Sequence, residues 1–174
     1  MTGLPNFLLA RPDLLSLPSA RLQAGSGTLP MSTDVLSELL SVVRLTGSVF
    51  FDVTATSPWV AEAPPSAQIA KDITPGAQHA IEYHVVTQGA CWISLVDDDS
   101  FEPVRLRQGD IAVLPHGNGH ALSSEPGMRA EPDWTLHRRP VDDNALPFKL
   151  TTGSGGPSDA HLICGFFSCD VRPF

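Results

Sequence analysis

The chain has 174 residues, enough for one domain with a hydrophobic core and too few for two domains of typical size. Its net charge of −8 and its pI near 5.0 argue against the basic surface that proteins use to neutralise nucleic-acid phosphates. No apolar segment is long enough to cross a membrane, and the first thirty residues lack the basic start and apolar block of a secretory signal. We therefore expect a cytoplasmic protein, with its three cysteines reduced.

The start of the chain divides into an extension and a helix. Residues 1–30 are rich in Leu, Pro, Ser and Gly, and their prolines are too closely spaced for a long helix. Ser32 or Thr33 then offers a helix N-cap, and apolar residues recur at helical spacing over 35–43. We expect a loose extension over 1–30 and one folded domain over 31–174, opening with a short N-terminal helix.

From residue 48 onward the pattern changes to short runs of β-branched and aromatic residues separated by turn signals. Strands are predicted over residues 48–55, 80–88, 91–96, 101–107, 111–114, 120–123, 148–151 and 161–169, and the break at Ser57-Pro58-Trp59 is expected to lead to a further strand or edge segment. A turn at Gly89-Ala90 is expected to separate the second and third of these runs, and no structure is assigned between Pro65 and Thr74. Residues 124–157 show little periodicity and are predicted to be a functional or disordered insertion. This spacing of strands favours a barrel or sandwich over a parallel α/β sheet.

One stretch, residues 109–120, combines a turn, an apolar strand and a second turn that ends in a histidine. It reads Gly-Asp-Ile-Ala-Val-Leu-Pro-His-Gly-Asn-Gly-His, so that Pro115 and Gly117 supply the reversal before His120. A second fragment is Glu82, followed after six residues by Gly89.

Glu82, His84 and His120 form the candidate site. The first two stand at i and i+2 and therefore share one face of a strand. Two imidazoles and a carboxylate suit a divalent metal, Zn²⁺ or Fe²⁺. Alternatively, the histidines are hydrogen-bonded and line an organic ligand pocket without metal. We expect ligand-binding residues His84, His120, Trp92 and Glu82; His79, His116 or a cysteine could extend a metal set.

These fragments resemble the two motifs of the cupin family, whose members are small double-stranded β-barrels. Residues 109–120 match the second motif, with Ser124 in place of the usual Asn. Of the first motif the chain keeps Glu82 and Gly89, and a single His79 stands near the place of its His-x-His pair. The resemblance implies a mostly β fold, a jelly-roll barrel, with Glu82 and His120 inside it.

A longer ordered set of blocks resembles the N-terminal cupin domain of AraC-type bacterial transcription regulators, from about residue 31 to the end. The blocks are residues 31–40, 47–51, 57–59, 83–92, 109–120 and 162–166. The resemblance implies a non-enzymatic sensor of a small-molecule effector or chemical stress that forms a homodimer. It also implies that DNA is contacted only through a C-terminal helix-turn-helix part, which is missing here. The alternatives are a metal-dependent cupin enzyme of the oxygenase or isomerase type, and a cupin that serves only as a dimerisation or structural module.

Overall fold

The computed structural model describes residues 7–11, 45–73, 79–134 and 146–169, and within these it contains nine strands and one helix. The elements are β1 (Leu8–Ala10), β2 (Leu45–Thr56), β3 (Val60–Ala63), α2 (Ser66–Ile73), β4 (His79–Leu95), β5 (Val104–Arg107), β6 (Ile111–Leu114), β7 (His120–Ser123), β8 (Phe148–Gly153) and β9 (Ala160–Cys169). No helix in these ranges is long and apolar enough to cross a membrane. The mostly β fold predicted from the sequence is confirmed.

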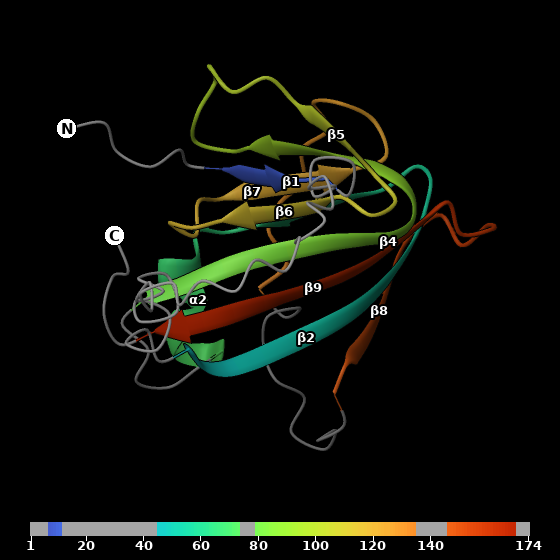
Figure 1. Ribbon diagram of the computed structural model, residues 1–174. Coiled ribbons are helices and arrows are strands. Elements are labelled where there is room, and N and C mark those ends of the chain that lie inside the picture. The colour runs from blue at the N-terminus through green and yellow to red at the C-terminus, as the bar shows by residue number, and fades with distance from the viewer. Residues whose placement is uncertain (1–6, 12–44, 74–78, 135–145, 170–174) are drawn as a thin grey trace, which may run out of the picture.

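Two sheets share the long strand β4. The larger sheet has the order β1-β6-β4-β9-β2-β8, and its strands β4, β9 and β2 lie side by side in Figure 1. The second sheet uses the C-terminal part of β4, which pairs with β5 and β7, while β7 also pairs with β3. All pairs are antiparallel except β2 with β8. The described strands form an open path, so the closed barrel expected from the sequence is not seen in them.

The turn predicted at Gly89-Ala90 is wrong, because β4 continues through it. Gly89 has a φ of +75° and sits beside a register shift between Val86 and Gln88, which marks a bulge. A side chain at position 89 would collide with the carbonyl of Asp159, so the close approach of β9 requires glycine here. Beyond this point β4 exchanges its partner β9 for β5 and β7. The glycine therefore bends one strand from the first sheet into the second.

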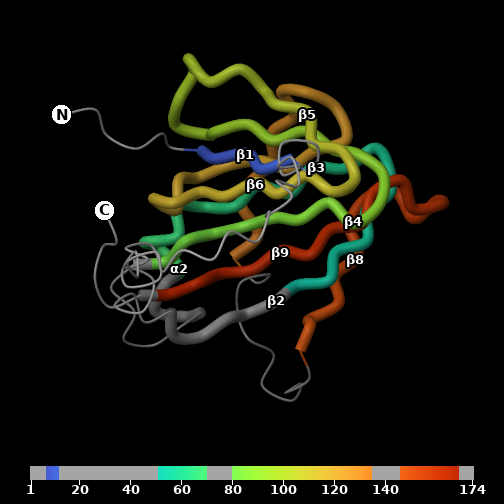
Figure 2. Tube along the Cα trace, viewed as in Figure 1, coloured from blue at the N-terminus to red at the C-terminus, as the bar shows by residue number. Residues whose placement is uncertain are grey.

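Two elements were not predicted. Helix α2 starts immediately after Pro64-Pro65. Proline is tolerated at the start of a helix because the first backbone N–H groups have no acceptor within the helix. Ile69 of α2 is buried in the core. Strand β1 lies inside the segment expected to be loose and pairs with β6, as Figure 2 shows by the blue tube beside the yellow one. Phe7 packs edge-on against Phe101, with ring centroids 5.4 Å apart. The helix predicted over residues 35–43 lies outside the described residues.

The core fills the space between the two sheets. Strand β6 shows the expected alternation, with Ala112 and Leu114 fully buried between partly exposed neighbours. Val86, Leu162 and Ile93 from the longer strands are also fully buried. The buried residues also include Glu82, His84 and His120, which form the site described next.

Candidate functional site

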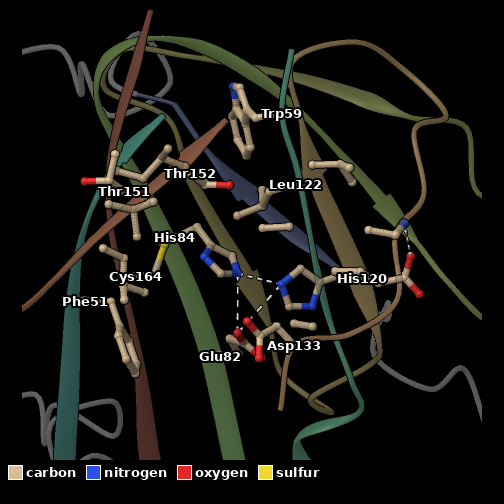
Figure 3. A pocket seen from close by; sticks show the side chains of 18 of the residues that line it. Phe51, Trp59, Glu82, His84, His120, Leu122, Asp133, Thr151, Thr152 and Cys164 are labelled. Atoms are coloured by element: carbon tan, nitrogen blue, oxygen red, sulfur yellow. Dashed lines mark hydrogen bonds and ion pairs between the residues drawn. The ribbon is translucent and has the colours of Figure 1, made fainter. Parts of the chain in front are cut away.

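Glu82, His84 and His120 come together between the two sheets, as their positions in the sequence predicted. Glu82 and His84 project from the part of β4 that pairs with β6 and β9, whereas His120 is the first residue of β7 in the other sheet. Their exposed fractions are 3%, 3% and 1%. Figure 3 shows the three side chains pointing toward one another. The site is therefore built across the sandwich, from both of its layers.

The three side chains are close enough to share one ion or one proton. The Nε2 atoms of His84 and His120 are 2.7 Å apart, and each lies 3.7 Å from Oε1 of Glu82. One donor atom from each residue falls within 4.8 Å of the other two. The arrangement fits both interpretations made from the sequence, a metal site and a hydrogen-bonded histidine pair.

A backbone contact fixes the orientation of His120. Its Nδ1 lies 3.1 Å from the carbonyl oxygen of Asn118, which can only accept a hydrogen bond, so Nδ1 carries the proton. The Nε2 of the neutral ring then presents a lone pair to the cluster, and His84 donates its Nε2 proton to it. Ligating histidines are typically oriented by a hydrogen bond that their other ring nitrogen donates to a carbonyl or carboxylate oxygen. The chain thus prepares His120 to coordinate through Nε2.

Glu82 is held by Ser66, the first residue of α2. The Ser66 hydroxyl donates a hydrogen bond of 3.3 Å to Oε2 of Glu82. Burial raises the pKa of Glu82 to about 8, although the Ser66 hydrogen bond works in the opposite direction. At neutral pH the carboxyl group is thus largely protonated as long as no cation faces it. Ser66 was not identified from the sequence, because the helix that carries it was not predicted.

The turn before β7 connects His120 to the start of α2. Gly117 has a φ of +62°, and its carbonyl oxygen accepts a 2.8 Å hydrogen bond from the backbone N–H of Ser66. A Cβ at position 117 would lie 2.6 Å from the Cβ of Ser66. The glycine in the 109–120 stretch therefore serves both the turn and the contact that positions Ser66 beside Glu82.

A cavity of about 290 Å³ opens onto the cluster, at the lower end of the size range of ligand pockets. Its apolar wall includes Phe51, Trp59, Leu122, Leu150, Leu162 and Phe166. Trp92, expected at the ligand site, does not line it. Cys91 and Ile93 on either side of Trp92 are buried, so strand alternation turns Trp92 the other way. The aromatic residue at the cavity is Trp59, which follows the Ser57-Pro58 break after β2.

The segment after β7 adds polar groups to the cavity. Arg129 donates to the Glu62 carboxylate on β3 at 2.7 Å and 3.0 Å, and the backbone N–H of Ala130 donates to it at 3.2 Å. These hydrogen bonds lower the pKa of Glu62, with the Arg129 contact as the largest cause. Glu131 and Asp133 follow and line the cavity with Ala130. Part of the predicted insertion is thus an ordered wall of the site.

A profile of the family described as Cupin matches residues 34–174. The chain belongs to the cupin family. No curated protein matches it at a significant level. Two similar solved structures are the Schizosaccharomyces pombe Cnp3 cupin domain (14% identity, TM-score 0.31, 75% of this chain and 67% of that chain) and a non-heme monooxygenase, the ThoJ-Ni complex (12% identity, TM-score 0.32, 77% and 49%). The chain thus spans about half the length of the monooxygenase.

The donor set of this cupin suits a metal ion. Two imidazoles and a carboxylate, all buried, are accepted by Zn²⁺ and by Fe²⁺ as a facial triad. Glu82, His84 and His120 would hold the ion, which would supply a Lewis acid at the inner end of the cavity. Cys164 lies opposite His84 in the strand register and lines the cavity. Burial, followed by the nearby Glu82 and Cys91, raises the pKa of Cys164 well above its usual range, so the thiol remains protonated.

The other histidines of this cupin stand apart from the cluster or outside the described part of the chain. His116, which could have extended a metal set, is instead exposed in the turn before β7. His161 contacts Asp52 and Thr87 from neighbouring strands and does not line the cavity. The side chain of His79 and all of His137 lie outside what the structure describes. Among the described histidines, the cavity is lined by His84 and His120 alone.

Proposed function

We propose that this cupin is the sensory domain of an AraC-type transcription regulator and binds a small-molecule effector in its cavity. The observation that carries the proposal is the cavity itself, which joins an apolar wall to the buried cluster of Glu82, His84 and His120. This combination of apolar area and a few convergent polar groups is typical of small-molecule sites. The ordered blocks that resemble AraC-type sensor domains give the proposal its regulatory part.

The remaining parts of the proposal follow from the same resemblance. The domain acts in the cytoplasm as a homodimer and is not an enzyme. DNA is contacted by a C-terminal helix-turn-helix pair outside this sequence, in agreement with a net charge of −8, which would repel phosphates. Effector binding in the cavity would stabilise one arrangement of the two sheets over another and so alter the dimer.

A thermal-shift screen with chemically diverse small molecules tests the proposal. Compounds that bind the cavity should raise the Tm of the wild-type domain, because a ligand that binds only the folded state stabilises it by mass action. The same compounds should have no effect on Leu150→Trp, which fills a partly exposed position in the cavity wall. The proposal fails when no compound raises the Tm, or when every stabilising compound acts equally on the variant.

A metal-dependent oxygenase or isomerase is the second candidate, favoured by the facial arrangement of two histidines and a carboxylate. Metal analysis of the purified protein by mass spectrometry separates the two functions. One equivalent of iron per chain, together with oxygen consumption in the presence of a cavity ligand, would favour the enzyme. Zinc or no metal, with ligand binding intact, would favour the sensor.

A further inference from the structure

The larger sheet has a second face, turned away from the site, and its central strands are apolar there. Strand alternation turns every second residue of β6, β4 and β9 to this face, and on β4 these residues alternate with the buried Glu82 and His84. The apolar side chains on this face, which we call the outer patch, belong to Ile81, Tyr83, Val85, Ile111, Val113, Ile163 and Phe167. A sheet face in contact with water normally carries polar side chains, as β5 does with Arg105 and Arg107 on either side of the buried Leu106. The outer patch therefore has the composition of a covered face.

Tyr83, at the centre of the outer patch, is more deeply buried than the sheet alone explains. Its exposed fraction is 8%. The ring stacks on that of Phe167, with centroids 4.7 Å apart, and the register neighbours of Tyr83 are Val113 on β6 and Gly165 on β9. Gly165 has no side chain, and the other two flank the ring along the sheet rather than lying over it. The burial of Tyr83 therefore indicates that a further segment covers the patch.

The connection between β1 and β2 ends at opposite corners of this face. The two strands lie on opposite sides of β4 in the larger sheet, as Figure 1 shows. By register, β1 ends at Ala10, level with Val85 of β4, whereas β2 begins at Leu45, level with His79. The core and the second sheet occupy the other side of the larger sheet. The direct path for residues 12–44 therefore runs over the outer patch.

Within this connection, the helix predicted over residues 35–43 matches the outer patch in length and in character. Its apolar side chains fall on one face of the helix, and they are Val35, Leu36, Leu39, Leu40 and Val43. A helix over 35–43 is about 13 Å long, and the strand from Ile81 to Val85 also spans about 13 Å. Arg44 is all that separates residue 43 from β2, so the helix is tethered at the His79 end of the patch. Because so short a helix is marginal alone in water, it needs an apolar surface of this kind.

The outer patch ends where the sheet face becomes polar. Beyond Val85, Thr87 lies 3.0 Å from Nδ1 of His161, and Nε2 of His161 lies 2.5 Å from Oδ1 of Asp52 on β2. The side chains of His161 and Asp52 are 34% and 24% exposed. A segment that covers the apolar positions and leaves these polar groups in water has to be short, as the predicted helix is.

We infer that the helix predicted over residues 35–43 docks on the outer patch and covers it. The apolar face of the helix packs on Ile81, Tyr83 and Phe167, and Ser41 on its opposite face points to water. Tyr83 stands between Glu82 and His84 in β4, so the docked helix supports from behind the strand that carries two residues of the site. The inference goes beyond the proposed function and does not depend on what the cavity binds.

Photo-crosslinking of the full chain tests the inference. In place of Phe167, p-benzoylphenylalanine keeps the ring at a half-buried position of the outer patch and adds a photoreactive group that bonds to whatever lies over it. Trypsin leaves residues 22–44 as one peptide, because no Lys or Arg lies between Arg21 and Arg44. Irradiation should join this peptide to the one that carries position 167. Tandem mass spectrometry should place the new bond within residues 35–43.

The same probe at Phe101 is the matched control. Its ring lies 5.4 Å from that of Phe7, so it should capture the N-terminal peptide that ends at Arg11 and not residues 22–44. In the chain with the probe at position 167, Leu39→Glu puts a charge on the apolar helix face and should abolish the adduct. Ser41→Glu, on the opposite face by helical spacing, should retain it. Far-UV circular dichroism and an unchanged Phe101 adduct in both backgrounds establish that the variants fold.

An adduct between position 167 and residues 35–43 of the same chain supports the inference. A cross-linked dimer on a denaturing gel overturns it and assigns the outer patch to a second copy of this chain. An adduct with another segment in its place, or none when the Phe101 probe gives its own, also overturns it. An adduct that persists in Leu39→Glu does the same. If Leu39→Glu does not fold, the adduct of the chain without that substitution decides.

Discussion

Single residues decide which chemistry the site can perform, and His120 is the clearest case. The Asn118 carbonyl fixes the proton on Nδ1 and leaves Nε2 to face His84 and Glu82. In the metal-free site, His84 must supply the proton between the two rings. A divalent ion in the site would require the proton of the neutral His84 ring to move to Nδ1 and would release the one on Glu82, so metal binding is coupled to proton release from the carboxyl group.

The first prediction concerns the metal. His84→Ala and His120→Ala should each abolish stoichiometric metal binding, because each removes one of three donors. His116→Ala, an exposed histidine in the turn before β7, should bind metal as the wild type does. Metal affinity should fall as the pH drops below about 8, the pKa of Glu82, and further below about 6.5, where free imidazoles become protonated. Metal analysis after dialysis at several pH values measures this, and pH-independent occupancy would contradict it.

The second prediction concerns the buried carboxyl group of Glu82 in the metal-free protein. Its pKa is about 8 in the folded state and 4.5 ordinarily, so between these values the folded chain holds a proton that the unfolded chain has released. The free energy of unfolding should therefore fall as the pH rises through this window. Glu82→Gln has no such proton and should lose less stability. Tm measured in EDTA from pH 5 to 8 should drop more steeply for the wild type; parallel curves would rule this out.

The third prediction uses two glycines of similar conformation. Gly117 and Gly127 both have positive φ, but a Cβ at 117 would press on Ser66, whereas one at 127 would meet nothing within 4 Å. Gly127→Ala should lower the free energy of unfolding by roughly 1–2 kcal/mol, because a residue with a Cβ is disfavoured at positive φ. Gly117→Ala should cost more and should also weaken metal binding, because it displaces the turn that delivers His120. Chemical denaturation of both variants measures the costs, and equal losses would show that the Ser66 contact contributes nothing.

At the scale of elements, β1 changes the interpretation of the N-terminal segment. The sequence predicted a loose extension over residues 1–30, yet residues 8–10 pair with β6. Phe7 and Leu9 pack against the core. Without β1, strand β6 would present an unpaired edge on the side away from β4. The pairing therefore covers the edge of the strand that leads directly into the His120 turn.

The fourth prediction follows from this pairing. Deletion of residues 1–11 should lower the Tm by more than about 5 °C, because it removes the β6 partner and the apolar contacts of Phe7 and Leu9. Deletion of residues 1–6 serves as the control and should leave β1 in place. Thermal unfolding of the two truncated chains gives the comparison. Equal Tm values would show that β1 adds no stability.

The whole molecule is stabilised by the apolar layer between its two sheets, which also forms the wall of the cavity. Leu162 of β9 is fully buried there, while Leu146, just before β8, is 45% exposed. Leu162→Ala should lower the free energy of unfolding by about 2–5 kcal/mol, because it enlarges a cavity in a packed layer. Leu146→Ala should cost less than about 0.5 kcal/mol. Denaturant midpoints measure both, and a small loss for Leu162→Ala would mean that the layer can collapse around the missing atoms.

Local patterns were enough to predict most strands and the three residues of the cluster. Residues 111–114 form a short apolar run between two turns and 120–123 follow the second turn, and the structure places β6 and β7 at the same bounds. Glu82 and His84 share a strand face by their spacing alone. The strand around Gly89 was misread because glycine marks a turn or a bulge equally well in a sequence. Which of the two forms depends on β9, whose backbone approaches there.

The sequence by itself determined the β-rich class, the His120 turn and the pairing of Glu82 with His84, because these depend on neighbours a few residues apart. Only the tertiary structure decided which residues from distant parts of the chain lie beside them. Ser66 reaches Glu82 through a helix whose start is set by Gly117, and Trp59, rather than Trp92, reaches the cavity. These contacts join residues distant in the chain. Side-chain direction and burial at such places follow from sheet pairing and packing, which no local pattern encodes.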